Sequence, residues 1–155
     1  MNNQTKVYIT KNLEETQELA KNLSKTLEKS NVLALYGELG SGKTTFAQGL
    51  AKSLGIKKRI ISPTFIILRA YKLKPQTPNP KSQKVKSFYH VDLYRIKDEK
   101  DIEGLGIDEI IKDKKNIVAI EWAEKIEKFL PRKRWDITFE HLNDNQRRIT
   151  INKLT

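Results

Sequence analysis

The chain has 155 residues, contains no cysteine and carries a formal charge of +11. This length suits one domain with its own core, and because we find no internal repeat or linker we expect a single domain over residues 1–155. The lack of cysteine excludes disulfides and thiolate metal sites. No apolar stretch is long enough to cross a membrane, and the N-terminal segment lacks the apolar core of a secretory signal. We therefore expect a cytoplasmic protein.

The positive charge leaves two interpretations open. Clustered Lys and Arg bind nucleic acids by releasing counterions from phosphates. A lysine-rich composition spread over solvated faces gives the same total without any partner, and most of the basic residues are dispersed along the chain. The one local concentration is the segment 72–86, which also contains three prolines.

The first half of the chain predicts a strand, a helix, a second strand and a second helix. Residues 7–10 alternate like a short strand, and apolar residues then recur at helical spacing from Leu13 to Leu27. Asn12, with Glu15 three residues later, is typical of a helix start. Residues 32–36 form an apolar run of the buried-strand type. Residues 44–54 have one apolar helical side and are followed by a glycine, which favours a helix end.

The second half predicts further strands and short helices. In chain order these are strands over 64–73 and 85–94 with a proline-rich loop between them, helical pieces within 98–112 interrupted near two glycines, a buried strand over 117–120, a helix over 123–130, and a hairpin around 143–146. This order predicts an α/β, layered P-loop NTPase-like fold with helices flanking a mixed sheet. We expect parallel pairing near the first strand and antiparallel pairing where hairpins join.

The segment GELGSGKTT, residues 37–45, lies between the second strand and the second helix and fits G-x-x-x-x-G-K-S/T in full. Glycines let successive backbone N–H groups turn toward phosphate oxygens, and a helix start favours the same anion. In this motif Lys43 reaches the β- and γ-phosphates and the Thr44 hydroxyl ligates Mg²⁺. The sequence therefore predicts a nucleoside triphosphate site.

A phosphate cradle of this kind also needs an acidic side chain on the metal side. Glu121 follows four apolar residues at a predicted strand end, where α/β sheets bind ligands. Asp92 lies in a more alternating strand. We favour Glu121 as the acid nearest Mg²⁺ and assign Asp92 to positioning the attacking water or another metal-bound water, but the residues alone leave open which of the two is the direct ligand.

Together with the glycine-rich segment, the blocks SPTF (62–65), HVDLYR (90–95), LGI (105–107) and IEWAEK (120–125) occur in an order that resembles the TsaE family, the small P-loop ATPases of bacterial tRNA threonylcarbamoyladenosine biosynthesis. The resemblance extends from about residue 7 to the final hairpin. The combination of blocks is far more specific than a P-loop alone.

The resemblance implies ATP and Mg²⁺ as cofactors, slow hydrolysis by the protein alone, and a role beside the TsaD and TsaB proteins, whose assembly transfers the threonylcarbamoyl group to tRNA. It implies catalytic roles for Lys43, Asp92 and Glu121, and metal contacts from Thr44 and Glu121. The implied nucleotide contacts are Leu39, Gly40, Ser41, Gly42, Lys43, Thr44 and Thr45. Residues 62–65 correspond to a switch-like loop, and Trp122 to an aromatic beside the acid. The segment 72–86 is longer than the family pattern, so partner contacts there do not transfer.

The sequence also contains features that bear on three other functions. A GTPase is disfavoured because the D-x-x-G match at residues 101–104 follows a charged run, and because N-K-x-D is missing. A small kinase would need a basic lid, and the segment 72–86 has no arginine to clamp phosphates. A nucleotide-gated tRNA-binding or assembly module with negligible catalysis agrees with the positive charge.

Overall fold

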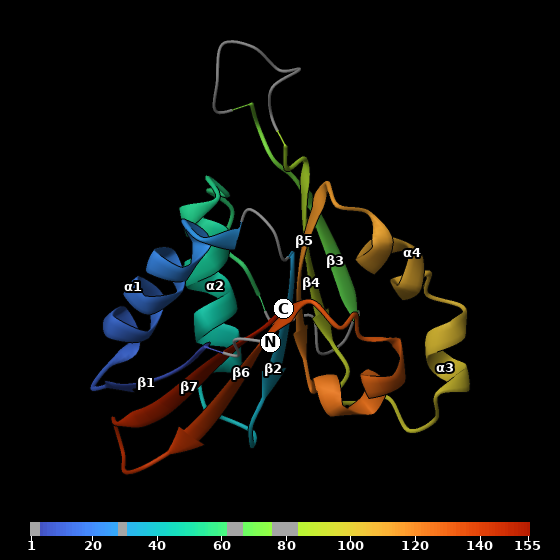
Figure 1. The fold of residues 1–155 in the computed structure, drawn as a ribbon. Coiled ribbons are helices and arrows are strands. Elements are labelled where there is room, and N and C mark those ends of the chain that lie inside the picture. The colour runs from blue at the N-terminus through green and yellow to red at the C-terminus, as the bar shows by residue number, and fades with distance from the viewer. Residues whose placement is uncertain (1–3, 28–30, 62–66, 76–83) are drawn as a thin grey trace.

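The computed structural model describes residues 4–27, 31–61, 67–75 and 84–155, and within them the chain forms one seven-stranded sheet with helices on both faces (Figure 1). The strands lie in the order β1-β7-β6-β2-β5-β4-β3. The elements, in chain order, are β1 (Gln4–Thr10), α1 (Leu13–Ser24), β2 (Val32–Tyr36), α2 (Lys43–Ser53), β3 (Leu68–Lys72), β4 (Ser87–Asp92), α3 (Lys100–Glu103), α4 (Ile107–Lys112), β5 (Asn116–Glu121), the 3-10 segment η3 (Ala123–Phe129), β6 (Arg134–His141) and β7 (Arg147–Leu154).

The sheet is mixed, as the sequence predicts, and its parallel part is central. β2 pairs in parallel with β5 and β6, and β4 pairs in parallel with β5. The outer pairs β1–β7, β6–β7 and β3–β4 are antiparallel. The expectation of parallel pairing near the first strand is therefore wrong for β1, because this strand adds to the C-terminal hairpin; the parallel pairs surround β2 instead.

Two apolar layers hold the helices against the sheet. On one face α1 and α2 bury residues such as Ala20, Phe46 and Leu50 against β2, β5 and the hairpin. On the other face α3, α4 and η3 bury Ile102, Ile107 and residues around them. Figure 1 shows these two groups of helices on opposite sides of the sheet. The buried runs of β2, over residues 32–35, and of β5 are what a strand covered on both faces requires.

The elements agree with the sequence in kind and differ at their ends. The two helical pieces, α3 and α4, are separated near Gly104 and Gly106 as predicted. β3 and β4 are shorter than the runs 64–73 and 85–94, and residues 62–66 lie outside the described residues. The predicted helix 123–130 is a 3-10 segment with a break at Ile126. Leu13, which we placed on the apolar face of the first helix, is 51% exposed.

This topology brings several chain segments to one edge of the sheet. The parallel strands β2, β4 and β5 all end at that edge, and α2 begins there. Ligands of α/β proteins bind at such carboxyl ends. Among the described residues, no helix has the length and apolar character needed to span a bilayer.

Candidate active site

The segment between β2 and α2 turns sharply, and its glycines make the turn possible. Gly37 and Gly42 have φ of +147° and +110°, in the region that L side chains rarely adopt. A Cβ on Gly37 would lie 2.6 Å from the carbonyl oxygen of Phe139, and one on Gly42 would lie 2.8 Å from Cδ of Arg147. The loop is therefore packed directly against β6 and β7, and only glycine fits at these two positions.

Lys43 is the first residue of α2 and its side chain is 3% exposed. Its Nζ donates hydrogen bonds to the carbonyl oxygens of Gly37 (2.6 Å) and Glu38 (2.9 Å). Nζ also lies 4.3 Å from the centroid of the Trp122 ring. Burial lowers the pKa of Lys43, and nearby carboxylates, of which Glu121 has the largest effect, oppose that shift. The result is a buried ammonium folded back onto its own loop, at the start of a helix that favours anions.

Thr44, Glu121 and His90 form a hydrogen-bonded group next to this lysine. The Thr44 hydroxyl donates to Oε1 of Glu121 at 2.8 Å. Nε2 of His90 lies 2.7 Å from the same oxygen. The side chain of Glu121 is 4% exposed and that of His90 is fully buried. A carboxylate withdrawn from water in this way is held by charge-assisted hydrogen bonds.

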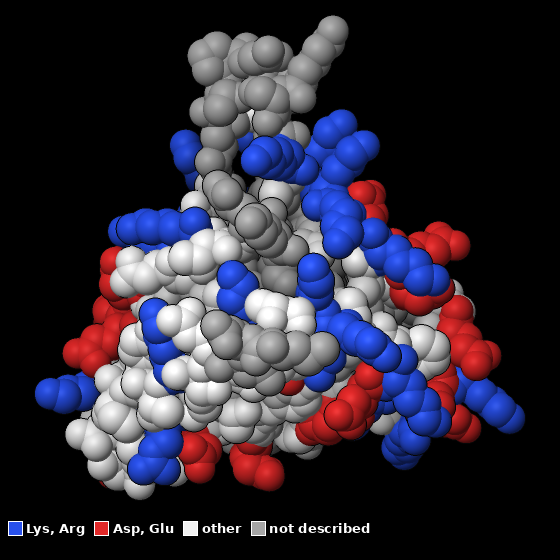
Figure 2. Space-filling model, in the orientation of Figure 1, with Lys and Arg blue, Asp and Glu red and all other residues white. Residues whose placement is uncertain are grey.

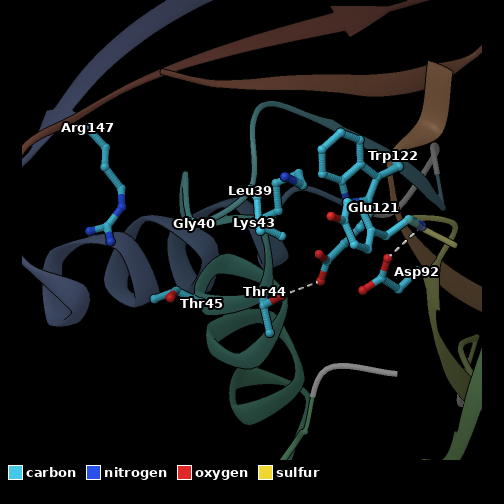
Figure 3. Close-up of a pocket in the computed structure, with 11 residues that line it drawn as sticks. Leu39, Gly40, Lys43, Thr44, Thr45, Asp92, Glu121, Trp122 and Arg147 are labelled. Atoms are coloured by element: carbon cyan, nitrogen blue, oxygen red, sulfur yellow. Dashed lines mark hydrogen bonds between the residues drawn. The ribbon is translucent and has the colours of Figure 1, made fainter. Parts of the chain in front are cut away.

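Asp92 and Glu121 are register partners at the ends of the adjacent parallel strands β4 and β5. Both side chains line the same pocket and both residues are 3% exposed. Oδ1 of Asp92 accepts a hydrogen bond from the backbone N–H of Tyr94 at 3.0 Å, which fixes this carboxylate (Figure 3). The two acids that the sequence predicted separately are thus adjacent, and both face the glycine-rich loop.

Trp122 closes one side of the pocket. Its backbone φ of +58° is unusual for a bulky residue and costs about 1–2 kcal/mol. The ring packs against Tyr94 with centroids 5.1 Å apart and covers Nζ of Lys43. Strain of this kind persists where the surroundings hold the residue in place. Here the left-handed backbone of Trp122, the residue directly after Glu121, places the indole ring over Lys43.

These residues surround a pocket of about 140 Å³ at the start of α2. Its lining consists of Leu39, Gly40, Gly42, Lys43, Thr44, Thr45, Asp92, Tyr94, Glu121, Trp122 and Arg147. Of the residues that the sequence assigned to the site, only Ser41 is missing from the wall. Ser41 is buried, its backbone N–H donates to the carbonyl of Glu38 at 3.1 Å, and its Oγ has no partner among the described residues. The predicted switch-like loop, 62–65, lies outside the described residues.

Arg147 is a pocket residue that the sequence analysis missed. It begins β7, about one hundred residues after the glycine-rich loop, and its side chain lies across Gly42. Its Nε is buried and has no hydrogen-bond partner among the described residues. Figure 3 shows the guanidinium reaching toward the start of α2, near Thr45. In the sequence it is one of two arginines in a hairpin strand, and no local signal distinguishes it from Arg148.

Comparison with known proteins decides the family. The model of the family "Threonylcarbamoyl adenosine biosynthesis protein TsaE" matches residues 10–149. The chain belongs to the TsaE family. The tRNA threonylcarbamoyladenosine biosynthesis protein TsaE of Bacillus subtilis is 39% identical over 142 residues, covering 92% of this chain and 82% of that protein. TsaE of Rickettsia felis is 37% identical over 144 residues, covering 92% and 77%.

Solved structures agree with this assignment. The crystal structure of Bacillus subtilis YdiB superposes with a TM-score of 0.74 at 32% sequence identity, covering all of this chain and 89% of that one. The TsaE family acts in tRNA threonylcarbamoyladenosine biosynthesis, so the chain is assigned to tRNA modification. The resemblance that the sequence motifs indicated is confirmed.

Proposed function

We propose that the protein binds ATP with Mg²⁺ in the pocket at the start of α2 and hydrolyses it slowly. The observation that supports this most directly is the convergence of Lys43, Thr44, Asp92 and Glu121 on a glycine-rich loop, from three elements far apart in the sequence. A pocket with backbone amides, one buried cation and two carboxylates matches the needs of phosphoryl transfer, in which catalysis is mainly positioning and charge stabilisation.

Each side chain has a distinct role in this proposal. Lys43 exchanges its two carbonyl acceptors for the β- and γ-phosphate oxygens, which compensates its buried charge better than neutral carbonyls do. Asp92, held by the N–H of Tyr94, orients the attacking water. Trp122 covers Lys43 and keeps bulk water away from it. Leu39, Gly40, Gly42 and Thr45 complete the phosphate-binding wall, and Ser41 supports the loop from inside.

The donor set fits Mg²⁺. This ion prefers oxygen ligands and binds proteins through one or two side chains plus phosphates and waters. The Thr44 hydroxyl and the Glu121 carboxylate are hydrogen bonded to each other at 2.8 Å beside the phosphate-binding loop, and Asp92 is the register partner of Glu121 on the adjacent strand. The described residues hold no cluster of three or more His, Cys, Asp or Glu side chains that would form an all-protein metal cage. Bound Mg²⁺ would neutralise the charge that develops on the β- and γ-phosphates.

ATP is the proposed nucleotide because the rival motif for GTP is not at the site. The D-x-x-G match at residues 101–104 lies in and just after α3, on the opposite face of the sheet from α2. None of these residues lines the pocket. A switch that senses the γ-phosphate would have to lie beside it.

We further propose that ATP turnover supports the TsaD and TsaB proteins in forming threonylcarbamoyladenosine on tRNA, and that this chain does not itself transfer the group. The pocket is small and its polar groups are those expected for phosphate and metal chemistry.

The experiment is steady-state phosphate release, with and without TsaD, TsaB and tRNA, for the wild type and for Lys43→Ala and Glu121→Ala. We expect a low rate alone, stimulation by the partners, and at least a hundredfold loss in either variant, as is usual when a transition-state charge contact is removed. Phosphate release at the wild-type level by both variants in the complete system would show that the ATPase assignment is wrong.

A second candidate role is weak tRNA contact through a basic surface, which would make the protein a nucleotide-gated binding module. Six exposed lysines lie at the end of the sheet opposite the pocket, where β4 and β5 begin and β3 ends. They are Lys72, Lys74, Lys84, Lys86, Lys114 and Lys115. Backbone bonds from Lys86 to Lys115 (2.7 Å) and from Leu73 to Lys86 (2.9 Å) bring them together. Figure 2 shows basic side chains gathered toward this end.

Filter binding of tRNA across salt concentrations tests this role. Neutralising Lys72, Lys86 and Lys115 to Gln should reduce the slope of log affinity against log salt, because fewer counterions are released. The control is a triple variant with the same change in net charge on other exposed surfaces, in which Gln replaces Lys6, Lys21 and Lys97. Equal slopes for the two triple variants would exclude this surface.

A further inference from the structure

Among the described residues, His90 is a fully buried side chain beside the site to which the proposed function assigns no role. It lies on β4 two residues before Asp92, so both side chains point to the sheet face that α2 covers. It is fully buried, in contact with Phe88 at a ring-centroid distance of 6.4 Å. Its paired residue on β5 is Ala119, and Glu121 is the diagonal neighbour on the same face. The small side chain of Ala119 leaves room for the imidazole to reach that carboxylate.

The hydrogen bonds assign the direction of this contact. A carboxylate accepts only, so Nε2 of His90 carries the hydrogen that points to Oε1 of Glu121 at 2.7 Å. Nδ1 is buried without a partner among the described residues, which agrees with its being the unprotonated nitrogen of this tautomer. His90 therefore presents one N–H, from a fixed position, to one oxygen of the acid.

Both donors of the group reach the same carboxylate oxygen. Thr44 Oγ1 donates to Oε1 of Glu121 at 2.8 Å, and His90 donates to the same oxygen at 2.7 Å. With Oε1 held by two fixed donors, the carboxylate has little rotational freedom, and its other oxygen is left to serve the ligand side of the pocket. Outer hydrogen-bond partners of metal-side ligands have this orienting effect, and their loss commonly lowers metal affinity 10–100-fold, as an order of magnitude.

We propose that His90 is a positioning residue: through Nε2 it fixes the Glu121 carboxylate against the Thr44 hydroxyl, and so preassembles the Mg²⁺ side of the nucleotide site. The inference rests on the proposed function, because it assumes that Thr44 and Glu121 serve Mg²⁺. The inference goes beyond the proposed function because it assigns His90 a defined effect on Mg²⁺ affinity and no effect on the binding of metal-free nucleotide.

Three substitutions at this position separate the hydrogen bond from packing. His90→Phe keeps a ring against Phe88 and removes the donor. His90→Gln places an amide N–H near the position of Nε2, whereas His90→Asn places the same group near Nδ1, out of reach of Glu121. The Gln and Asn variants are thus matched in chemistry and differ in where the donor lies.

The measurement is the dissociation constant of ATP in EDTA and in Mg²⁺. Its readout is the value in EDTA divided by the value in Mg²⁺, which is the factor by which Mg²⁺ strengthens ATP binding. We expect Phe and Asn to lower this ratio by about tenfold, as is typical for a lost hydrogen bond to a charged acceptor, and Gln to restore most of it. The affinity in EDTA should stay within about twofold of wild type in every variant that folds, because Lys43 and the loop amides are untouched.

A double-mutant cycle with Glu121→Gln completes the test. If His90 acts through Glu121, His90→Asn has no further effect on the ratio in that background. The inference is overturned if Asn and Gln give the same ratio, or if the effect of Asn persists without the Glu121 carboxylate. A wild type that binds ATP equally with and without Mg²⁺ would instead refute the proposed function, so the two failures are distinguishable.

Discussion

The contact between Thr44 and Glu121 predicts a stability change that requires no nucleotide. Thr44→Val replaces the hydroxyl with a methyl of similar size and keeps the branching at Cβ, so helix propensity and packing of α2 change little. What changes is the partner of a carboxylate in a residue only 3% exposed, which loses the O–H held at 2.8 Å. The perturbation therefore removes one buried charge-assisted hydrogen bond and very little else.

The magnitude follows from that bond. A hydrogen bond to a charged group contributes about 1.5–3 kcal/mol, and since His90 still donates to the same oxygen we expect a loss near the lower end, about 2 kcal/mol. For a chain of 155 residues this lowers Tm by about 4–8 °C. Thr44→Ser keeps the hydroxyl and loses one methyl from a half-buried residue, so it should cost less than about 1 kcal/mol.

Urea unfolding of the nucleotide-free protein, followed by circular dichroism in EDTA, measures both variants. The slope of unfolding free energy against urea should be unchanged, which shows that the folded and unfolded states keep their compactness. A free energy of unfolding for Thr44→Val within about 0.5 kcal/mol of both wild type and Thr44→Ser would refute the reasoning, because it would mean that the carboxylate is satisfied without this hydroxyl.

Three further predictions concern other parts of the site and its support. Arg147→Ala should weaken ATP binding about tenfold in titration calorimetry, because a half-buried cation that lines the pocket is lost. Arg148→Ala, at an exposed neighbouring position, should not weaken it, and equal effects of the two substitutions would remove Arg147 from the site. Gly49→Ala should destabilise the protein by about 1–3 kcal/mol although alanine has the better helix propensity, because the new Cβ would lie 2.6 Å from the backbone of α1. Gly104→Ala, where a Cβ would meet open space, is the stability control. ATP affinity should fall as pH rises through the pKa of Lys43, which burial lowers below the ordinary lysine value of 10.5, because phosphate binds the charged form. Arginine does not titrate in this range, so Lys43→Arg should lose this dependence of ATP affinity on pH. A pH dependence that is retained in Lys43→Arg would assign it to another group.

The local sequence carried much of the fold. The apolar run of β2 matches its predicted bounds, and α2 differs from its predicted range by one residue at each end. Asn12 caps α1 as predicted, since its side chain accepts from the N–H of Glu15 at 2.8 Å. Elements such as these depend on residues close together in the chain, so periodicity and capping are enough to find them. The ends of β3 and β4 were less accurate, because strand ends depend on the neighbouring strand, and most of the predicted proline-rich loop lies outside the described residues.

The sequence alone also determined the family and the parts of its site that lie within one motif. The glycine-rich loop needs left-handed backbone at fixed spacing and a lysine at the helix start, and these requirements are written in consecutive residues. Tertiary structure decided the rest: that Asp92 and Glu121 are register partners, that His90 and Thr44 share one oxygen, and that Arg147 reaches the loop while Ser41 turns inward. The physical reason is that these contacts are set by strand pairing and side-chain direction between segments tens of residues apart. A residue's neighbours across a sheet depend on register, which a single strand's sequence does not specify.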